Sequence, residues 1–343
     1  MDVSTTLMWL GFALSAYAVI GNDFIQTLGT FFSSNEKDIS WTTMYAFSTT
    51  VLSVLLIWGY LQGDVSFGRL SHLPEINHFT LVHLLPPLVL LIITRYGIPV
   101  STTFMILTFF SLSEVPADFF AITDNIFNPD TRLGKMTQKA VFGYFTAFLF
   151  SLMIYGFLIY KLELRYNIQK PSEKSVKYWR ILQVAATLFL WIQWILQDAG
   201  NIYVFLHQGK GIELREFVIS LFIVNIMLLL LFADRGGKIM DVIRNKRNYT
   251  DIRSATFIDL FFGIMLFLFI EDYFNIWGEK NLISTTWVFL GIMGGRELSL
   301  QFKTHRIIPK KTAIIVLTEF AKITAGLLIS FLLVFLLKLV SFG

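Results

Sequence analysis

Long apolar runs follow one another along most of this chain, with short polar connections between them. A run of about 17 to 25 apolar residues is long enough to cross a bilayer as a helix. We expect crossings at 6–32, 42–61, 78–94, 138–160, 181–206, 216–232, 255–274 and 313–340, with shorter apolar pieces at 100–112 and 282–293. Only 15% of the residues are charged, against about 25% in a soluble domain. The sequence predicts an all-α polytopic membrane protein.

The residue types that are rare or absent narrow the function classes. The chain has no cysteine, which excludes disulfides and thiolate chemistry. Its five histidines are scattered, so we expect neither an enzyme nor a bound cofactor. The first apolar run lacks a preceding basic segment, and we interpret it as a permanent span. The basic residues fall in loops, where membrane topology explains them and nucleic-acid binding is not needed.

Three basic stretches orient the chain in the membrane. They lie at 161–180, 235–253 and 296–311, and cytoplasmic loops are the ones enriched in Lys and Arg. All three fall in the cytoplasm if each short apolar piece completes one crossing. Each half then crosses five times, so the second half enters from the opposite side and both termini lie outside the plasma (inner) membrane. We predict a first repeat at 1–160, a basic cytoplasmic linker at 161–180 and a second, inverted repeat at 181–343.

A polar group interrupts the first apolar run and returns in the second half. Asn22, Asp23 and Gln26 form the first copy, and the second copy consists of Gln197, Asp198 and Asn201. Ionisable residues inside a membrane span are costly and usually mark a functional site. Their hard oxygens suit Na⁺, and a single carboxylate also suits H⁺. We expect an unwound turn around each aspartate; a structural polar network between helices is the alternative interpretation.

A second motif also occurs twice, in the same order and at nearly the same spacing. Ser101, Thr102 and Thr103 precede one short apolar piece, and Ser284, Thr285 and Thr286 precede the other. Hydroxyls at the N-terminus of a half-helix, beside free N–H groups, bind oxyanions. The alternative is that they only cap the helix. Inverted repeats with broken or re-entrant helices near the midplane are typical of secondary transporters.

Other polar residues in the apolar runs are weaker candidates. Glu319 and Lys322 are three apart on one expected helix face and should neutralise each other. His83 and Asp259 stand near the starts of corresponding runs. We expect each of these two residues to be a satisfied packing group.

At these two motifs the chain resembles the PiT family of inorganic phosphate transporters, which includes sulfate permeases. That family repeats Gly-Ala-Asn-Asp-Val-Ala-Asn and Pro-Val-Ser-Thr-Thr-His. Segment 95–103 is similar to the second motif, whereas the later copy at 281–286 lacks its Pro. Both copies lack the His, where Phe104 and Trp287 stand, and segment 236–240 resembles a basic loop of the family.

The first family motif is kept with substitutions. Asn22 and Asp23 match it, but Gln26 replaces an Asn. In the second copy Asp198 and Asn201 match, and Gln197 replaces the first Asn. Because Gln is one methylene longer than Asn, each replacement reshapes a ligand position.

The resemblance implies cation-coupled symport of inorganic phosphate by alternating access, driven by Na⁺ or H⁺, with a homodimer possible. Sulfate or another oxyanion is an alternative substrate, and an uncoupled anion channel or a structural subunit is an alternative function. The implied anion contacts are Ser101, Thr102, Thr103, Ser284, Thr285 and Thr286. The implied cation ligands are Asn22, Asp23, Gln26, Gln197, Asp198 and Asn201, with Asp23 and Asp198 binding Na⁺ if sodium is the coupling ion.

Overall fold

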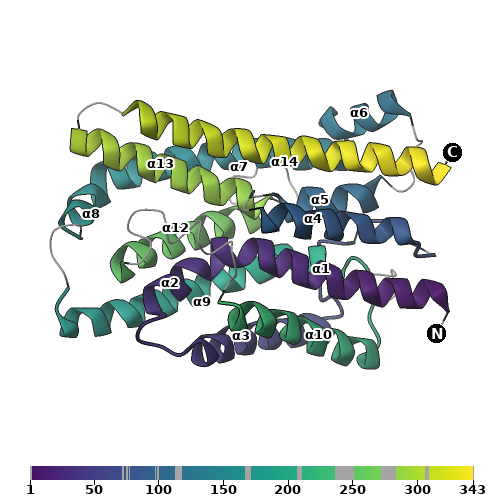
Figure 1. Cartoon of the computed structure of the whole chain (residues 1–343), viewed down its shortest axis with the longest axis horizontal. Helices are drawn as coiled ribbons and strands as arrows, with labels where there is room; N and C mark the ends of the chain where they lie inside the picture. The colour runs from purple at the N-terminus through teal and green to yellow at the C-terminus, as the bar shows by residue number, and fades with distance from the viewer. Residues whose placement is uncertain are drawn as a thin grey trace.

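The computed structural model describes most of the chain as a bundle of helices (Figure 1). The described residues are 2–71, 73, 74, 76, 78–96, 98, 100–112, 118–166, 171–206, 211–235, 251–271, 283–305 and 309–342. Every regular element within these ranges is helical, and seven helices there are long and apolar enough to cross a membrane. The predicted all-α polytopic class is confirmed.

The first half contains several short helices beside its long ones. Its helices are α1 (Val3–Thr27), α2 (Gly29–Asn35), α3 (Trp41–Leu61), η1 (Leu81–Leu84), α4 (Leu85–Arg95), α5 (Thr102–Ser111), α6 (Phe119–Phe127), α7 (Arg132–Met153), the π-helical turn η2 (Ile154–Ile159) and α8 (Tyr160–Tyr166). The second half has α9 (Glu173–Tyr203), α10 (Leu214–Ala233), α12 (Ile252–Ile270), α13 (Thr285–His305) and α14 (Lys310–Phe342). Side-chain caps start several of them, among them Asp2 at α1 and Ser40 at α3.

Two expectations about helix breaks are wrong. The chain does not unwind at Asp23, because α1 stays helical to Thr27, and α9 runs unbroken through Asp198 to Tyr203. The polar side chains of both segments find partners outside their own helices, so their own backbones can keep their helical hydrogen bonds. The apolar piece expected at 282–293 is the start of a longer helix, α13, that continues to His305.

The two termini lie at one end of the bundle, and the described parts of the first and third basic stretches lie at the other. Figure 1 shows both termini at one end, while α8, the start of α9, the end of α13 and the start of α14 lie at the other. Most of the second basic stretch, 236–250, lies outside the described residues. Termini at one end agree with an even number of crossings; the cytoplasmic side of the loops, the inverted relation of the halves and the boundaries at 161 and 181 stay predictions.

Helices α7 and α13 approach each other closely because glycines face α7. A Cβ at Gly291 would lie 2.4 Å from the Tyr144 carbonyl oxygen, and one at Gly295 would lie 2.3 Å from that of Phe148. Small residues four apart let membrane helices bring their backbones together. The Ser151 hydroxyl then donates to the Ile292 carbonyl oxygen at 2.6 Å. The close approach of α7 accounts for glycine at positions 291 and 295 of α13.

We expect Gly291→Ala to lower the unfolding midpoint of the purified protein, since its methyl group would overlap the Tyr144 carbonyl. Overpacking of this kind costs about 1–3 kcal/mol. Gly294→Ala is the matched control, because the nearest atom to its Cβ is a Val316 side-chain methyl at 3.3 Å and not a backbone atom. Thermal unfolding in detergent compares the two, and equal midpoints would contradict this account of the α7–α13 contact.

Candidate functional site

All twelve residues that the two sequence motifs single out are deeply buried, and their hydrogen bonds connect them across helices α1, α5, α9 and α13. None is more than 4% exposed: they are Asn22, Asp23, Gln26, Ser101, Thr102, Thr103, Gln197, Asp198, Asn201, Ser284, Thr285 and Thr286. Figure 1 shows α13 starting near the middle of the bundle. The polar groups of both halves therefore form one site.

The two Ser-Thr-Thr segments meet tip to tip. The Ser284 hydroxyl donates to the Ser101 hydroxyl oxygen at 2.8 Å. Ser101 also caps α5, because its hydroxyl oxygen accepts from the Phe104 amide at 3.3 Å. The capping interpretation therefore describes part of what Ser101 does. The contact between two helix N-termini from different halves is more than capping requires.

The amide that precedes each aspartate holds one of these tips. Asn22 Nδ2 donates to the Val100 carbonyl oxygen at 2.8 Å, and Gln197 Nε2 donates to the Ile283 carbonyl oxygen at 2.6 Å. Val100 and Ile283 each stand directly before a Ser-Thr-Thr segment. In both halves, therefore, the amide holds the backbone directly before a Ser-Thr-Thr segment. The longer Gln197 side chain still reaches its carbonyl oxygen.

The amide that follows each aspartate by three residues joins that aspartate to the other half. Gln26 Nε2 lies 3.5 Å from Asp23 Oδ1 and 3.1 Å from the Thr286 hydroxyl. Asn201 Nδ2 lies 2.5 Å from Asp198 Oδ1 and 3.2 Å from the Thr103 hydroxyl. Since Thr103 and Thr286 end the two Ser-Thr-Thr segments, each half supplies an amide to the other half's hydroxyl.

The Thr102 hydroxyl lies between the two carboxylates. It is 3.2 Å from Asp23 Oδ2 and 3.4 Å from Asp198 Oδ1. We expected the aspartates to stand beside the hydroxyls as a separate set. The structure instead interleaves the two sets, so a cation and an anion held by these groups would be close neighbours.

The two carboxylates differ in how fully they are hydrogen bonded. Asp23 accepts at both oxygens, with Asn22 and Gln26 at Oδ1 and Trp194 Nε1 and Thr102 at Oδ2. Asp198 Oδ2, in contrast, accepts from no group among the described residues.

Three further buried oxygens of the site, Gln26 Oε1, Asn201 Oδ1 and Thr285 Oγ1, are likewise without a donor in the described part of the chain. A buried oxygen without a donor is costly. With Asp198 Oδ2 they make a carboxylate, two amide carbonyls and a hydroxyl, which is the ligand chemistry of a hard cation.

Sequence reasoning missed three residues of the site. The Thr94 hydroxyl donates to Asn22 Oδ1 at 3.1 Å. Arg69 NH2 donates to Gln197 Oε1, and Arg69 Nε donates to the Leu196 carbonyl oxygen at 3.3 Å. Trp194 had a detectable signal, since it precedes Asp198 by one helical turn. Arg69 had none, because it stands in a polar connection where a solvated arginine is the ordinary expectation.

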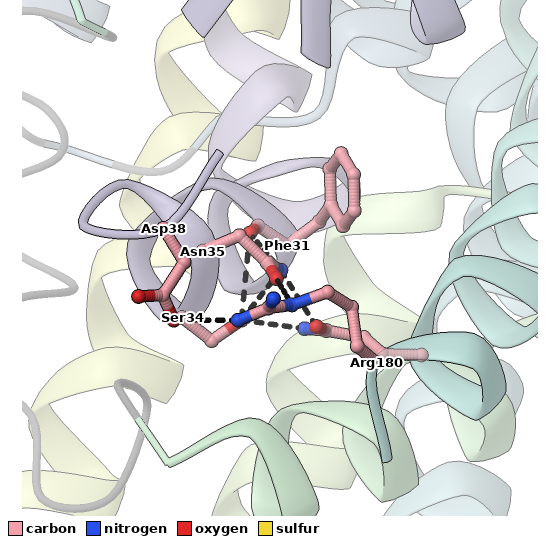
Figure 2. A network of polar contacts seen from close by, with 6 residues as sticks. Phe31, Ser34, Asn35, Asp38 and Arg180 are labelled. Carbon is pink, nitrogen blue, oxygen red and sulfur yellow. Dashed lines mark hydrogen bonds and ion pairs between the residues drawn. The ribbon is translucent and has the colours of Figure 1, made fainter. Parts of the chain in front are cut away.

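A second polar network ties the end of α2 to the first turns of α9 (Figure 2). Asn35 Nδ2 donates to Gln183 Oε1 at 2.7 Å, and Gln183 Nε2 donates to the Ser34 hydroxyl at 2.6 Å. Arg180 bonds Asn35 Oδ1 at 3.3 Å and forms an ion pair with Asp38 at 2.5 Å. This network lies apart from the twelve residues and fastens α2 to α9.

The weaker candidates are satisfied groups, as expected. Asp259 accepts from the hydroxyls of Thr30 and Thr187, the latter at 2.7 Å. His83 contacts Thr80 at the start of η1. Lys322 lies 3.3 Å from Glu319 on α14, which confirms that pair.

Comparison with known proteins finds a similarity in structure but none in sequence. No protein-family model matches the chain, and no curated protein matches its sequence. A solved structure described as "The sodium-dependent phosphate transporter" is similar with a TM-score of 0.56 and 16% sequence identity, over 98% of this chain and 97% of that chain. At this identity the likeness concerns the fold. The chain therefore shares, over nearly its whole length, the fold of a transporter.

Proposed function

We propose that the chain is a secondary transporter that carries inorganic phosphate together with a cation by alternating access. The observation that carries this proposal is the single buried site in which two carboxylates meet two hydroxyl-bearing helix N-termini. The shared fold with a structure described as a sodium-dependent phosphate transporter supports it. The likeness at the two sequence motifs supports it independently of the fold.

The anion would bind at the Ser-Thr-Thr tips. A tetrahedral oxyanion accepts hydrogen bonds from several directions, and two facing helix N-termini offer hydroxyls, N–H groups and positive dipole ends. Ser101 and Ser284 now bond each other. In the loaded site their hydroxyls would donate to anion oxygens instead.

The cation would bind at the open oxygens, of which Asp198 Oδ2 is the charged one. Two carboxylates repel an anion strongly in a buried site. A bound cation removes that repulsion, so cation and anion each bind well only when the other is present. This is the physical basis of coupling. Because the open oxygens match hard metal ions, we favour Na⁺ over H⁺.

Two alternative functions would each differ from the proposed one in a single property, the substrate or the coupling. Sulfate or another oxyanion would use the same tips, and an uncoupled anion channel would need no cation ligands. The paired buried carboxylates favour coupling. We place the protein in the plasma (inner) membrane with both termini outside, either alone or as a homodimer.

Uptake into proteoliposomes tests the proposal. We expect labelled phosphate to accumulate when an inward Na⁺ gradient is imposed, and to accumulate much less with K⁺ in its place. Parallel runs with a pH gradient and with labelled sulfate identify the coupling ion and the substrate. If no gradient drives uptake of either anion, the proposed function is wrong.

We expect Ser101→Ala and Ser284→Ala each to raise the KM for phosphate roughly tenfold, since a hydrogen bond to a charged group contributes about 1.5–3 kcal/mol. Ser48→Ala is the matched control. That serine is also fully buried, but among the described residues its hydroxyl bonds only the Met44 carbonyl oxygen within α3. Unchanged KM values in both tip variants would favour a structural role for the tips over anion binding.

A further inference from the structure

One tryptophan of the second half donates to the carboxylate of the first half. Trp194 Nε1 lies 3.0 Å from Asp23 Oδ2, and the Trp194 side chain is buried. Trp194 precedes Asp198 by four residues, which is about one turn of α9. Its N–H nevertheless serves the aspartate of α1. Neither of the two sequence motifs includes this residue.

Trp194 completes the hydrogen bonding of Asp23. A carboxylate has about four positions at which a donor can bond. At Oδ1 the donors are Asn22 at 2.8 Å and Gln26 at 3.5 Å. At Oδ2 they are Trp194 and, at 3.2 Å, the Thr102 hydroxyl. A cation needs a lone pair that no donor uses, so Asp23 offers no free position while these donors stay in place.

The indole is the hardest of these donors to displace. A hydroxyl such as that of Thr102 can rotate without moving its helix. An indole N–H is fixed in the plane of its ring, and the Trp194 ring stacks on that of Trp191, with centroids 4.5 Å apart and an angle of 4° between the planes. Both rings are buried, and a close-packed interior leaves little room for a ring to swing aside. Trp194 therefore keeps Asp23 Oδ2 closed to a cation.

The first half has no counterpart of this donor. Val19 precedes Asp23 by the same four residues, and its side chain has no hydrogen to donate. Correspondingly, Asp198 Oδ2 accepts from no group in the described part of the chain, although Asp198 Oδ1 accepts from Asn201 at 2.5 Å. The residue one turn before each aspartate thus differs between the halves, and so does the closure of the two carboxylates.

We propose that Trp194 excludes the coupling cation from Asp23, so that the site binds one cation and Asp198 is its charged ligand. The inference rests on the proposed function and adds the cause that makes the two carboxylates unequal. Asp23 then acts as an acceptor that aligns the Thr102 hydroxyl at the start of α5. Trp194 is a positioning residue, because it contacts Asp23 and needs to touch neither the cation nor the phosphate.

The cation dependence of phosphate uptake by Trp194→Phe tests the proposal. Phenylalanine keeps an aromatic ring against Trp191 but has no N–H, so it leaves a position at Asp23 Oδ2 open. A second cation can then bind, and we expect the Hill coefficient for the cation to rise from about 1 in the wild type toward about 2. Trp191→Phe is the matched control. It removes an equally buried indole N–H, which bonds the Ser48 carbonyl oxygen at 3.0 Å and no carboxylate, and it should keep the wild-type coefficient.

A double variant gives a readout that a purely structural tryptophan would not change. Asp198→Asn alone should lose cation-driven uptake. Adding Trp194→Phe should restore part of it, because Asp23 can then bind the cation in place of Asp198. Loss of a hydrogen bond to a charged group should raise the cation affinity of Asp23 roughly tenfold, so we expect uptake at limiting cation to exceed that of the single variant by about the same factor.

A reversal-potential measurement on the wild type alone counts the cations carried per phosphate, so the test does not depend on the variants folding. More than one cation per phosphate would overturn the role of Trp194 and leave phosphate transport intact. A folded Trp194→Phe with the wild-type Hill coefficient, or a folded double variant without restored uptake, would overturn it as well. Absence of cation-driven phosphate uptake in the wild type would overturn the proposed function itself, and this inference with it.

Discussion

Asp198→Asn is expected to abolish cation-driven uptake, and Asp23→Asn to weaken it by a smaller factor. The difference follows from the hydrogen bonds. Asp198 Oδ2 is open, whereas both oxygens of Asp23 are occupied by neutral donors. At an effective dielectric of about 20, a carboxylate and a cation about 4 Å apart attract each other by about 4 kcal/mol, or roughly a thousandfold in affinity. The amide of Asn keeps the shape of Asp but loses this attraction.

The measurement is the cation concentration that gives half-maximal uptake at fixed phosphate. Asp124→Asn removes an exposed carboxylate on α6 and should leave it unchanged. If Asp198→Asn shows the same cation dependence as wild type, Asp198 does not serve as the coupling site. If Asp23→Asn is the more damaged variant, the open oxygen of Asp198 is not the main ligand.

The membership of the site could be predicted from the sequence because both motifs occur twice and in the same order. A carboxylate inside an apolar run is costly enough to demand partners, and the second copy indicated where those partners lie. What the motifs could not show is that Thr102 stands between Asp23 and Asp198. That contact depends on how α5 is inserted between α1 and α9, which no local pattern describes.

The helix breaks were harder to predict for the same reason. Polar residues in α1 suggested an unwound turn, but Trp194 and the Val100 carbonyl satisfy them from outside the helix. The apolar residues at 282–293 suggested only a short piece, but α7 packs against the glycines of α13 and this helix continues to His305. In both cases a tertiary contact overrides a local tendency. Arg69 was the hardest of these residues to predict, because its contacts with Gln197 and Leu196 join segments far apart in the sequence.

A buried ion pair fastens the end of the bundle that holds α8. Arg296 NH2 lies 3.1 Å from Glu163 Oε2, and the two side chains are 1% and 0% exposed. The Ser254 hydroxyl donates to the same carboxylate oxygen at 2.7 Å, and the Arg296 guanidinium lies 5.5 Å from the centre of the Tyr155 ring. Glu163 is on α8, Ser254 on α12 and Arg296 on α13. One carboxylate thus joins three helices far from the twelve site residues.

Arg296→Met is expected to destabilise the protein by about 3–5 kcal/mol, because it leaves the Glu163 carboxylate buried without its counter-charge. The double variant Glu163→Gln with Arg296→Met removes both charges and should recover much of that loss. Lys322→Met breaks the more exposed Glu319 pair, in which the lysine side chain is 40% exposed, and should cost at most about 1 kcal/mol. Unfolding midpoints in detergent rank the three variants. The pair lies away from the twelve residues of the candidate site, so the folded double variant should keep the wild-type cation dependence of uptake. A changed dependence would contradict the proposal that coupling depends on those twelve residues.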